Sequence, residues 1–173
     1  MKNSQIKVLM VCLGNICRSP TAEAVFRHHI QQAGLSGVIA VDSAGTSDWH
    51  VGERPDYRSI EHAASRGYDL STQRSRQIQH GDFLKFDYVL AMDQQNLRDL
   101  EAMAPGRALA EVSLFLGEQG VQGYTDVPDP YSSGNAGFEL VLDLVETASL
   151  NVLNRIIATH KLKPAVSAGN GNG

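Results

Sequence analysis

The sequence predicts an α/β protein in which helices cover both faces of a parallel sheet. Four short runs of strand-forming residues alternate with longer stretches whose apolar residues recur every three to four positions. Strands that are separated by helices favour right-handed crossovers, which give a parallel sheet between two helical layers. At 173 residues the chain suits a single three-layer domain with a full hydrophobic core.

The first strand is expected over residues 6–11, and its mostly apolar sequence indicates that both of its faces are buried. Ser19 and Pro20 then combine a capping residue with a proline in the first turn, so a helix begins there and ends at Gly34. A second strand is expected over 38–44, and it leads into a polar loop.

The middle of the chain continues the alternation of helices and strands. Gly67 and Pro105 end two of the helical stretches. The expected elements are a helix over 55–66, a short helix over 71–79, a strand over 88–92, a helix over 94–103 and a strand over 112–116.

Residues 117–137 are a long segment rich in Gly, Pro, Ser and Asp, and loops of this length in compact domains are usually functional. This segment carries Asp129. Apolar residues at helical spacing from Phe138 onwards predict a long amphipathic final helix. We expect the domain to span residues 1–162, and we expect residues 163–173, which end in Gly-Asn-Gly-Asn-Gly, to be a disordered tail.

The composition excludes several classes of partner and compartment. A net charge of −4 gives no basic footprint, so nucleic acid is not an expected partner. No stretch approaches the roughly 18 apolar residues of a membrane helix, and the N-terminal apolar run is too short for a signal peptide. Cys12 and Cys17, the two cysteines, are a poor disulfide framework for a domain of this size. We therefore expect a protein of the reducing cytoplasm that does not bind a membrane.

The chemistry concentrates on residues 8–20, where an apolar run turns through a short loop into a helix. Such a turn leaves several backbone N–H groups unpaired, and together with the helix dipole they attract an anion. Cys12 begins the loop, and the same field favours its thiolate over its thiol. Arg18 adds a planar fork of donors that matches the geometry of phosphate. A thiolate beneath a phosphate cradle predicts phosphoryl transfer through a cysteine.

This loop resembles the signature loop of the low-molecular-weight protein tyrosine phosphatases. Besides Cys12 and Arg18, the matching positions are Gly14, Asn15, Cys17 and Ser19. That family also carries Asp-Pro-Tyr far downstream, which corresponds to residues 129–131. Further matching segments are 42–46, 47–49, 86–88 and 96–97. The similarity covers roughly residues 6–160 in the family's order, and it implies a four-stranded sheet with the strand order 2-1-3-4.

The resemblance implies a cysteine-dependent protein-tyrosine phosphatase with three catalytic residues. Cys12 attacks the phosphorus and forms a phosphocysteine, which water then hydrolyses. Arg18 holds two phosphate oxygens, and this binding helps most as charge shifts in the transition state. Asp129 protonates the leaving phenolate and afterwards takes a proton from the attacking water, so it must carry a proton when a dianionic substrate binds. The expected substrates are phosphotyrosine in proteins and small aryl phosphates.

Further positions are expected to bind the substrate or to shape the loop. Ser19 can cap the helix, and the resemblance adds a hydrogen bond between its hydroxyl and the Cys12 sulfur. Asn15 can stabilise a left-handed turn, and the resemblance pairs its side chain with Ser43. The expected substrate-binding residues are Leu13, Gly14, Asn15, Ile16, Cys17, Ser19, Trp49 and Tyr131.

Trp49 and Tyr131 are candidate walls for an aromatic ring, which would favour phosphotyrosine over the shorter phosphoserine. Two positions depart from many members of the family. Ser132 stands where a second aromatic residue often follows, so that rim of the pocket is expected to be smaller or more polar. Gln73 lies near the place where some members have a histidine that contacts the loop.

Neither a metal nor a cofactor is expected. The six histidines are scattered and show no metal-ligand spacing. Cys17 could trap an oxidised Cys12 as a reversible disulfide, or it could simply be a small loop residue that packs inward.

Two other functions stay open at this point. Similar loops occur in arsenate reductases of this fold, but no cysteine follows Cys17 to pass a disulfide along, so only a glutathione- or glutaredoxin-assisted reductase would fit. A non-catalytic module could bind phosphotyrosine in the same cradle, although Cys12, Arg18 and Asp129 are all present. As partners we expect phosphotyrosine-containing proteins, with a tyrosine kinase as one candidate. We expect a monomer, although the sequence fixes neither the oligomeric state nor the physiological substrate.

Overall fold

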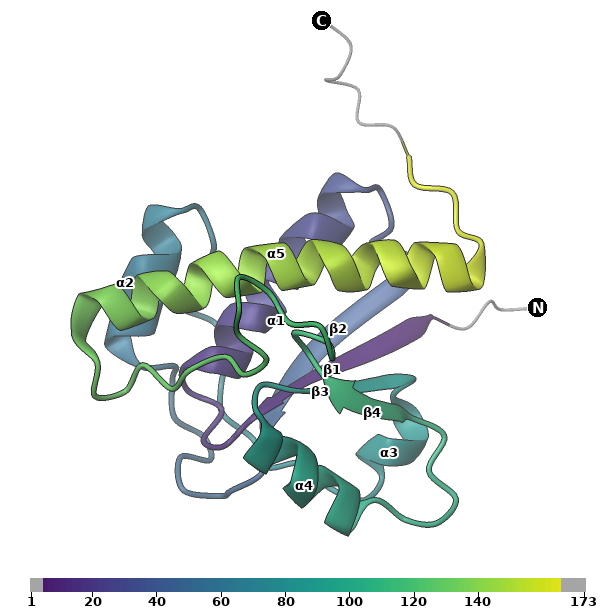
Figure 1. The fold of residues 1–173 in the computed structure, drawn as a ribbon, viewed down its shortest axis with the longest axis horizontal. Helices are drawn as coiled ribbons and strands as arrows, with labels where there is room; N and C mark the ends of the chain where they lie inside the picture. Colours follow the sequence, from purple (N-terminus) through teal and green to yellow (C-terminus); the bar gives the residue numbers. More distant parts are fainter. Residues whose placement is uncertain (1–4, 166–173) are drawn as a thin grey trace, which may run out of the picture.

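The structure is a computed structural model that describes residues 5–165 of the chain. Its centre is a four-stranded parallel sheet with the order β2-β1-β3-β4, as the resemblance implied (Figure 1). The strands are β1 (Ile6–Cys12), β2 (Ile39–Gly45), β3 (Tyr88–Ala91) and β4 (Glu111–Leu114). The helices are α1 (Arg18–Gln32), α2 (Tyr57–Ser65), α3 (Asp82–Lys85), α4 (Gln94–Met103) and α5 (Gly134–His160). Helices α1, α2 and α5 cover one face of the sheet and α3 and α4 cover the other, which gives the three predicted layers.

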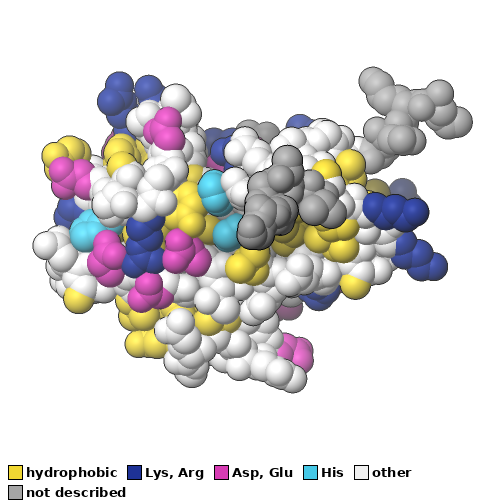
Figure 2. Space-filling view, turned by 90° about the horizontal axis from the view of Figure 1, so that it is seen from above, with side chains coloured by type: hydrophobic (Ala, Val, Ile, Leu, Met, Phe, Trp, Pro, Cys, Tyr) yellow, Lys and Arg dark blue, Asp and Glu magenta, His cyan; other side chains and the backbone are white. Residues whose placement is uncertain are grey.

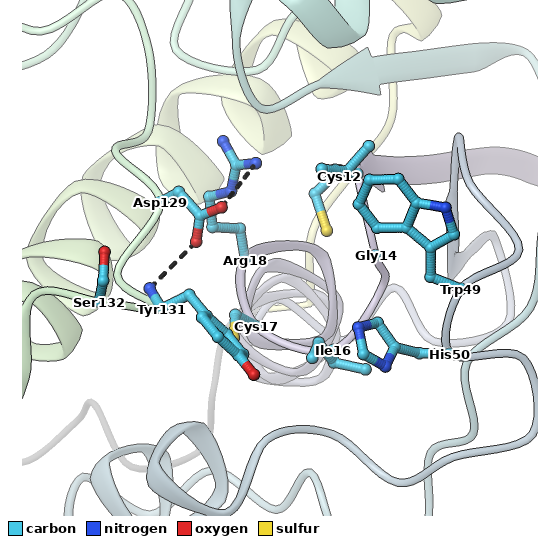
Figure 3. A pocket seen from close by; sticks show the side chains of 11 residues that line it. Cys12, Gly14, Ile16, Cys17, Arg18, Trp49, His50, Asp129, Tyr131 and Ser132 are labelled. Atoms are coloured by element: carbon cyan, nitrogen blue, oxygen red, sulfur yellow. Dashed lines mark hydrogen bonds and ion pairs between the residues drawn. The ribbon is translucent and has the colours of Figure 1, made fainter.

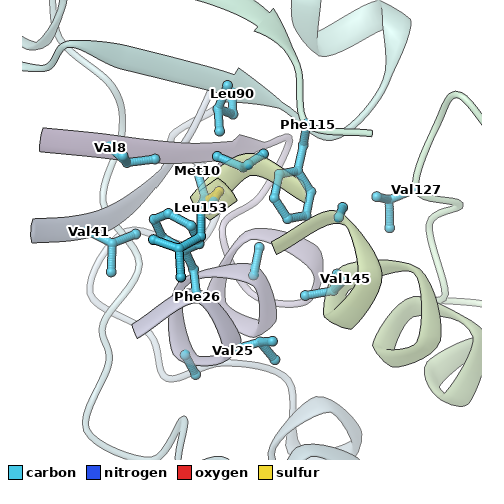
Figure 4. Close-up of a cluster of buried hydrophobic side chains, with 14 of the residues drawn as sticks. Val8, Met10, Val25, Phe26, Val41, Leu90, Phe115, Val127, Val145 and Leu153 are labelled. Carbon is cyan, nitrogen blue, oxygen red and sulfur yellow. The ribbon is translucent and has the colours of Figure 1, made fainter. Parts of the chain in front are cut away.

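The central position of β1 explains why its apolar run is continuous. Val8 and Met10 point towards α1 and α5, where they pack in one cluster with Phe26 (Figure 4). Leu9 and Val11 point to the other face, into the cluster beneath α3 and α4. All four β1 side chains are fully buried. A parallel strand that is covered on both faces has no solvent-facing side, so its sequence shows no period of two.

One predicted element is wrong, because residues 71–79 do not form a helix. They run past the end of β2, where the Gly45 N–H donates to the Arg76 carbonyl and the Ile78 N–H donates to the Gly45 carbonyl, both at 2.8 Å. These bonds occupy backbone groups that a helix would pair internally. A local pattern cannot reveal them, since their partner lies far earlier in the chain.

The remaining elements differ from their predictions mainly at their ends, where helices fray. Helix α5 begins at Gly134, before the predicted start at Phe138, and β4 ends at Leu114 rather than at residue 116. The four-residue helix α3 was not predicted, because so short an element carries too little periodicity. None of the described helices has the length and apolar character that a membrane span requires. The predicted tail over 163–173 lies mostly outside the described residues, so its disorder and the domain boundary stay predictions.

A group of charged side chains holds α2 against α5, and Figure 2 shows acidic, basic and histidine side chains gathered on this face. Arg66, which follows α2, forms ion pairs with three carboxylates of α5. These are Glu139 at 2.7 Å, Asp143 at 2.9 Å and Glu146 at 2.8 Å. Their spacing of four and three residues places all three on one face of the helix. His62 of α2 also bonds to Glu139, so the two helices are joined at two points.

We expect Arg66→Ala to lower the free energy of unfolding by about 1–2 kcal/mol, because three neighbouring carboxylates on one helix face would lose their common partner. Urea denaturation at low and high salt measures the effect, and salt should reduce it. Arg155→Ala is the matched control, since Arg155 pairs with a single exposed carboxylate, that of Glu111 at 2.9 Å. Its loss should cost about 0.5 kcal/mol or less. Equal losses in both variants would contradict a special role for Arg66.

Candidate active site

The loop between β1 and α1 turns its backbone carbonyl groups away from a common centre. Five of the carbonyls, all except that of Asn15, accept a hydrogen bond from a neighbouring residue or segment. The bonds are Thr46 N–H to Cys12 (2.9 Å), Ser47 N–H to Leu13 (3.0 Å), Ser75 Oγ to Gly14 (3.0 Å), Asp56 N–H to Ile16 (2.7 Å) and Thr21 Oγ1 to Cys17 (2.8 Å). In a planar trans peptide the N–H points opposite to the C=O, so outward carbonyls leave inward N–H groups. The loop therefore forms a nest of donors, which is a concavity that binds anions.

Two backbone positions make this tight turn possible. Asn15 has a φ of 56°, the left-handed conformation that asparagine tolerates better than most residues. Gly45, at the end of β2, lies directly against the loop, and a Cβ atom there would stand only 2.7 Å from the Leu13 carbonyl oxygen. A side chain at position 45 would therefore displace the loop backbone.

The Asn15 side chain fixes the loop from behind. Its Nδ2 donates to Ser19 Oγ at 2.8 Å and to Ser43 Oγ at 3.0 Å, and its Oδ1 accepts from the Arg76 N–H at 3.0 Å. The Asn15–Ser43 hydrogen bond that the resemblance implies is thus present. Ser43 in turn donates to Glu23 at 2.6 Å, and burial raises the pKa of this carboxyl. Every polar group in this chain of contacts has a defined partner.

The same network directs a proton towards the Cys12 sulfur. Ser19 Oγ lies 3.0 Å from Cys12 Sγ, and the Asn15 N–H lies 3.3 Å from the same sulfur. Because Ser19 Oγ already accepts from Asn15, its own proton is free to donate, and its other acceptor, the Ala44 carbonyl, is more distant at 3.5 Å. Two donors are thus aimed at one sulfur atom.

Arg18, the first residue of α1, is 3% exposed, and protein groups hold its guanidinium in place. Nη1 donates to Asp93 Oδ2 at 2.6 Å and to the Val127 carbonyl at 3.0 Å. Burial disfavours the charged form, but the neighbouring Cys12 and Asp93 outweigh this effect and raise the pKa of Arg18. Nε has no hydrogen-bond partner within residues 5–165, so the buried fork keeps an unused donor for a ligand.

Asp93 is a site residue that sequence reasoning missed. Its Oδ1 accepts from the Asn96 N–H at 2.7 Å and so caps α4, while its Oδ2 orients Arg18. A usable signal existed, because Asp93 directly follows a predicted strand and ligands of parallel sheets bind at the carboxyl ends of the strands.

A cavity of about 420 Å³ opens above the loop (Figure 3). Its lining residues are Cys12, Leu13, Gly14, Ile16, Cys17, Arg18, Trp49, His50, Asp129, Tyr131 and Ser132. Trp49 and Tyr131 stand on opposite sides of the opening and are 68% and 55% exposed. Asp129 lies at the mouth, where its Oδ1 accepts from the Tyr131 N–H at 3.1 Å and its Oδ2 is 3.9 Å from Arg18 Nη2. The cavity can thus hold an aromatic ring between Trp49 and Tyr131, with an attached phosphate against the anion-binding loop.

Three predicted site residues, Asn15, Ser19 and Ser43, do not line the cavity and instead lie behind the loop that they support. His50 lines the cavity although it was not predicted as a site residue. Its Nδ1 is 3.0 Å from Glu53 Oε1, and its ring edge lies over Gly14. The position of His50 next to Trp49 in the polar loop could have predicted that it lines the cavity.

The two departures from the family have different structural outcomes. Ser132 lines the cavity, so the rim is polar there, as expected. Gln73 Nε2 donates to the Pro20 carbonyl at 3.0 Å, and thus contacts the start of α1 rather than the loop. The contacts to the loop from this region come instead from Ser75 and Arg76.

Cys17 is buried and free, as is Cys12. Burial raises the pKa of the Cys17 thiol to about 12. The two cysteines of one loop thus differ in chemistry, since donors surround the sulfur of Cys12 while Cys17 stays protonated at neutral pH.

The fold and the loop together define a class: an α/β protein whose first strand ends in a cysteine beside an anion-binding turn. Comparison with known proteins identifies it. The family model described as low molecular weight phosphotyrosine protein phosphatase matches residues 7–163. The chain therefore belongs to this family. Within the described residues, no group of three or more His, Cys, Asp or Glu side chains is arranged to hold a metal ion.

Individual relatives agree with the family match. A putative low molecular weight protein-tyrosine-phosphatase of Synechocystis is 47% identical over 152 residues, which are 87% of this chain and 96% of that protein. The crystal structure of a protein tyrosine phosphatase from Entamoeba histolytica has a TM-score of 0.85 and 39% identity, and the match covers 91% of this chain and all of that one. The crystal structure of a Drosophila arginine phosphatase has a TM-score of 0.82 and 33% identity, with coverages of 87% and 98%.

We expect iodoacetamide at neutral pH to modify Cys12 in the native protein and to leave Cys17 unmodified. The reason is that thiolates react and thiols do not, and the pKa of Cys17 is raised to about 12. Mass spectrometry of peptides from the labelled protein measures this, with protein unfolded in urea as the control in which both cysteines react. Equal labelling of both cysteines in the native protein would contradict the assignment.

Proposed function

We propose that the protein hydrolyses phosphotyrosine in proteins, and small aryl phosphates, through a phosphocysteine intermediate on Cys12. The observation that carries the proposal is the position of the Cys12 sulfur at the base of the cavity, with N–H groups and the Arg18 guanidinium around it. A phosphate in this cradle meets a thiolate, a fixed guanidinium and a carboxyl group at the mouth.

In the first step the Cys12 thiolate attacks phosphorus and the bond to the phenolic oxygen breaks. The loop N–H groups and Arg18 bind the three remaining phosphate oxygens as negative charge shifts towards them. Asp129 gives its proton to the departing oxygen, which leaves as the phenol. The position of Asp129 at the mouth, opposite the sulfur, supports this role.

In the second step water attacks the phosphocysteine and Asp129 takes the proton of that water. The sulfur–phosphorus bond breaks and Cys12 leaves as a thiolate. Ser19 Oγ, at 3.0 Å from the sulfur, stabilises this leaving group by donating its proton. Inorganic phosphate then departs and the site returns to its first state.

The walls of the cavity favour an aromatic leaving group. Trp49 and Tyr131 flank the opening, and Arg58 stacks on the Tyr131 ring at 5.4 Å from its centroid, which steadies that wall. The fold alone does not fix the phosphorylated side chain, since the family's fold is shared by a Drosophila arginine phosphatase. We therefore treat phosphoarginine as the rival substrate that a test must include.

We propose that the protein acts as a monomer in the cytoplasm on phosphotyrosine-containing proteins, among them a tyrosine kinase. The two free thiols support a reducing compartment. We also propose that Cys17 can protect an oxidised Cys12 by forming a disulfide with it. Its raised pKa makes this trapping slower at neutral pH than with an ordinary thiol, because little thiolate is present.

We expect the parent protein to release phosphate from a phosphotyrosine peptide near pH 6 under reducing conditions, and Cys12→Ser to bind the peptide without turnover. The substitution removes the nucleophile but keeps the N–H cradle and Arg18. Phosphate release and calorimetric binding are the two measurements, with a phosphoserine peptide as the control.

Other outcomes of this experiment point to the rival functions. Binding by the parent without release would indicate a phosphotyrosine-binding module. Faster release from phosphoarginine would indicate the rival substrate. Neither release nor binding, together with arsenate reduction in the presence of glutathione and glutaredoxin, would indicate a reductase.

We expect Asp129→Ala to lower turnover by roughly 10²- to 10⁴-fold, the range typical for loss of a general acid and base. The loss should be larger for aryl phosphates with poor leaving groups, because these need the proton most. Steady-state rates with p-nitrophenyl and phenyl phosphate measure it. If the variant turned over both substrates as fast as the parent, Asp129 would have no catalytic role.

A further inference from the structure

The turn that carries Asp129 cannot hold its position through its own backbone. Pro128 and Pro130 flank Asp129, and neither has an N–H to donate. Its bonds are the Tyr131 N–H to Asp129 Oδ1 at 3.1 Å and the Ser133 N–H to the Pro130 carbonyl at 2.9 Å. Both bonds are local, so contacts outside the turn must determine where it lies over the cavity.

Two contacts immediately before the turn attach it to the rest of the protein. Val127 is fully buried, its N–H donates to the Met92 carbonyl at 2.8 Å, and its carbonyl accepts from Arg18. Asp126 Oδ1 accepts from the Gln94 N–H at 3.0 Å, in the first turn of α4. Both hydrogen bonds of Val127 use backbone atoms of that residue, whereas the Asp126 bond uses a side-chain atom that a substitution can remove.

We propose that Asp126 is a positioning residue for the acid–base step, because its carboxylate fixes the turn that carries Asp129. This inference rests on the proposed function. Asp126 and Asp129 lie three positions apart, a span of about 10 Å of extended chain at most. Val127 and Pro128 are the residues between them, and Pro128 stiffens that span, so a shift at residue 126 is passed through a short, stiff segment to the carboxyl group of Asp129. A misplacement of about 1 Å in a reacting group can cost as much as 100-fold in rate.

The start of α4 is a suitable anchor for the turn. The Gln94 N–H belongs to the first helical turn, whose N–H groups have no partner within the helix, and the helix dipole favours a carboxylate there. Asp93, which caps the same helix, holds Arg18 at 2.6 Å. The phosphate-binding arginine and the turn of the general acid are therefore positioned from one helix end.

A purely structural role makes a different prediction. If Asp126 only capped α4, its loss would reduce stability or expression and would change the turnover of all substrates alike. If it positions the general acid, its loss should depend on the leaving group, since a good leaving group needs little protonation. The dependence of kcat/KM on the leaving group therefore separates the two roles.

The experiment compares Asp126→Ala and Asp126→Asn with the parent, using p-nitrophenyl phosphate and phenyl phosphate. We expect Asp126→Ala to lower kcat/KM roughly 10-fold or more for phenyl phosphate and less than about 3-fold for p-nitrophenyl phosphate. Asp126→Asn should stay close to the parent, because its amide oxygen can still accept from Gln94. Asp87→Ala is the matched control, since Asp87 accepts the Lys7 N–H at 2.8 Å at the amino ends of the central strands, away from the cavity.

Equal loss on both substrates, no loss, or a loss in Asp126→Asn as large as in Asp126→Ala would each overturn the proposal. If Asp126→Ala does not fold, Asp126→Glu serves in its place. The added methylene displaces the turn while the charge is kept. The same dependence on the leaving group is then expected. Asp129→Ala is measured in parallel. If that variant lacks the dependence, the proposed role of Asp129 fails; if only the Asp126 variants lack it, this inference alone fails.

Discussion

The site depends on one constraint: hydrogen bonds hold five carbonyl groups of the loop after β1 outward, so that the N–H groups that follow them can point inward. The partners that hold these carbonyls come from four separate parts of the chain, namely the end of β2, the start of α2, the extended segment near residue 75, and α1. The loop geometry is therefore a property of the whole fold. An isolated strand–loop–helix segment would not keep this conformation, because water could hydrogen-bond to the same carbonyl groups in many other conformations.

This constraint explains which parts of the site the sequence could predict. Cys12 and Arg18 were predicted from their residue types and spacing on a strand-to-helix turn, whereas the role of Asp129 and the strand order came from the resemblance. The segment 71–79 was misassigned because its bonds go to Gly45, and its side chains fit a helix equally well. Ser75 and Arg76 were missed as supports of the loop for the same reason. Asp93 looked like an ordinary helix cap, and only the structure shows that its second oxygen orients Arg18.

Helix α1 begins at the cavity and α4 begins beside Arg18, and the two N-termini have different roles. The start of α1 is left open and contributes N–H groups and a positive dipole to the anion cradle. The start of α4 is already occupied by the carboxylates of Asp93 and Asp126. Occupied by carboxylates, it serves as a fixed point for Arg18 and for the segment before Asp129.

In the proposed reaction, the recognition of the ring and the delivery of the proton both depend on one turn. The Tyr131 N–H holds the Asp129 carboxyl, and the Tyr131 ring is a wall of the cavity that Arg58 supports from outside. Arg58 in turn bonds to Asp56, whose N–H holds the loop at Ile16. A ring that lies against Tyr131 therefore brings its phenolic oxygen towards Asp129 and its phosphate towards Cys12. A shorter side chain such as phosphoserine could place its phosphate in the cradle but would leave this wall unused, so its leaving oxygen would be held less well for protonation.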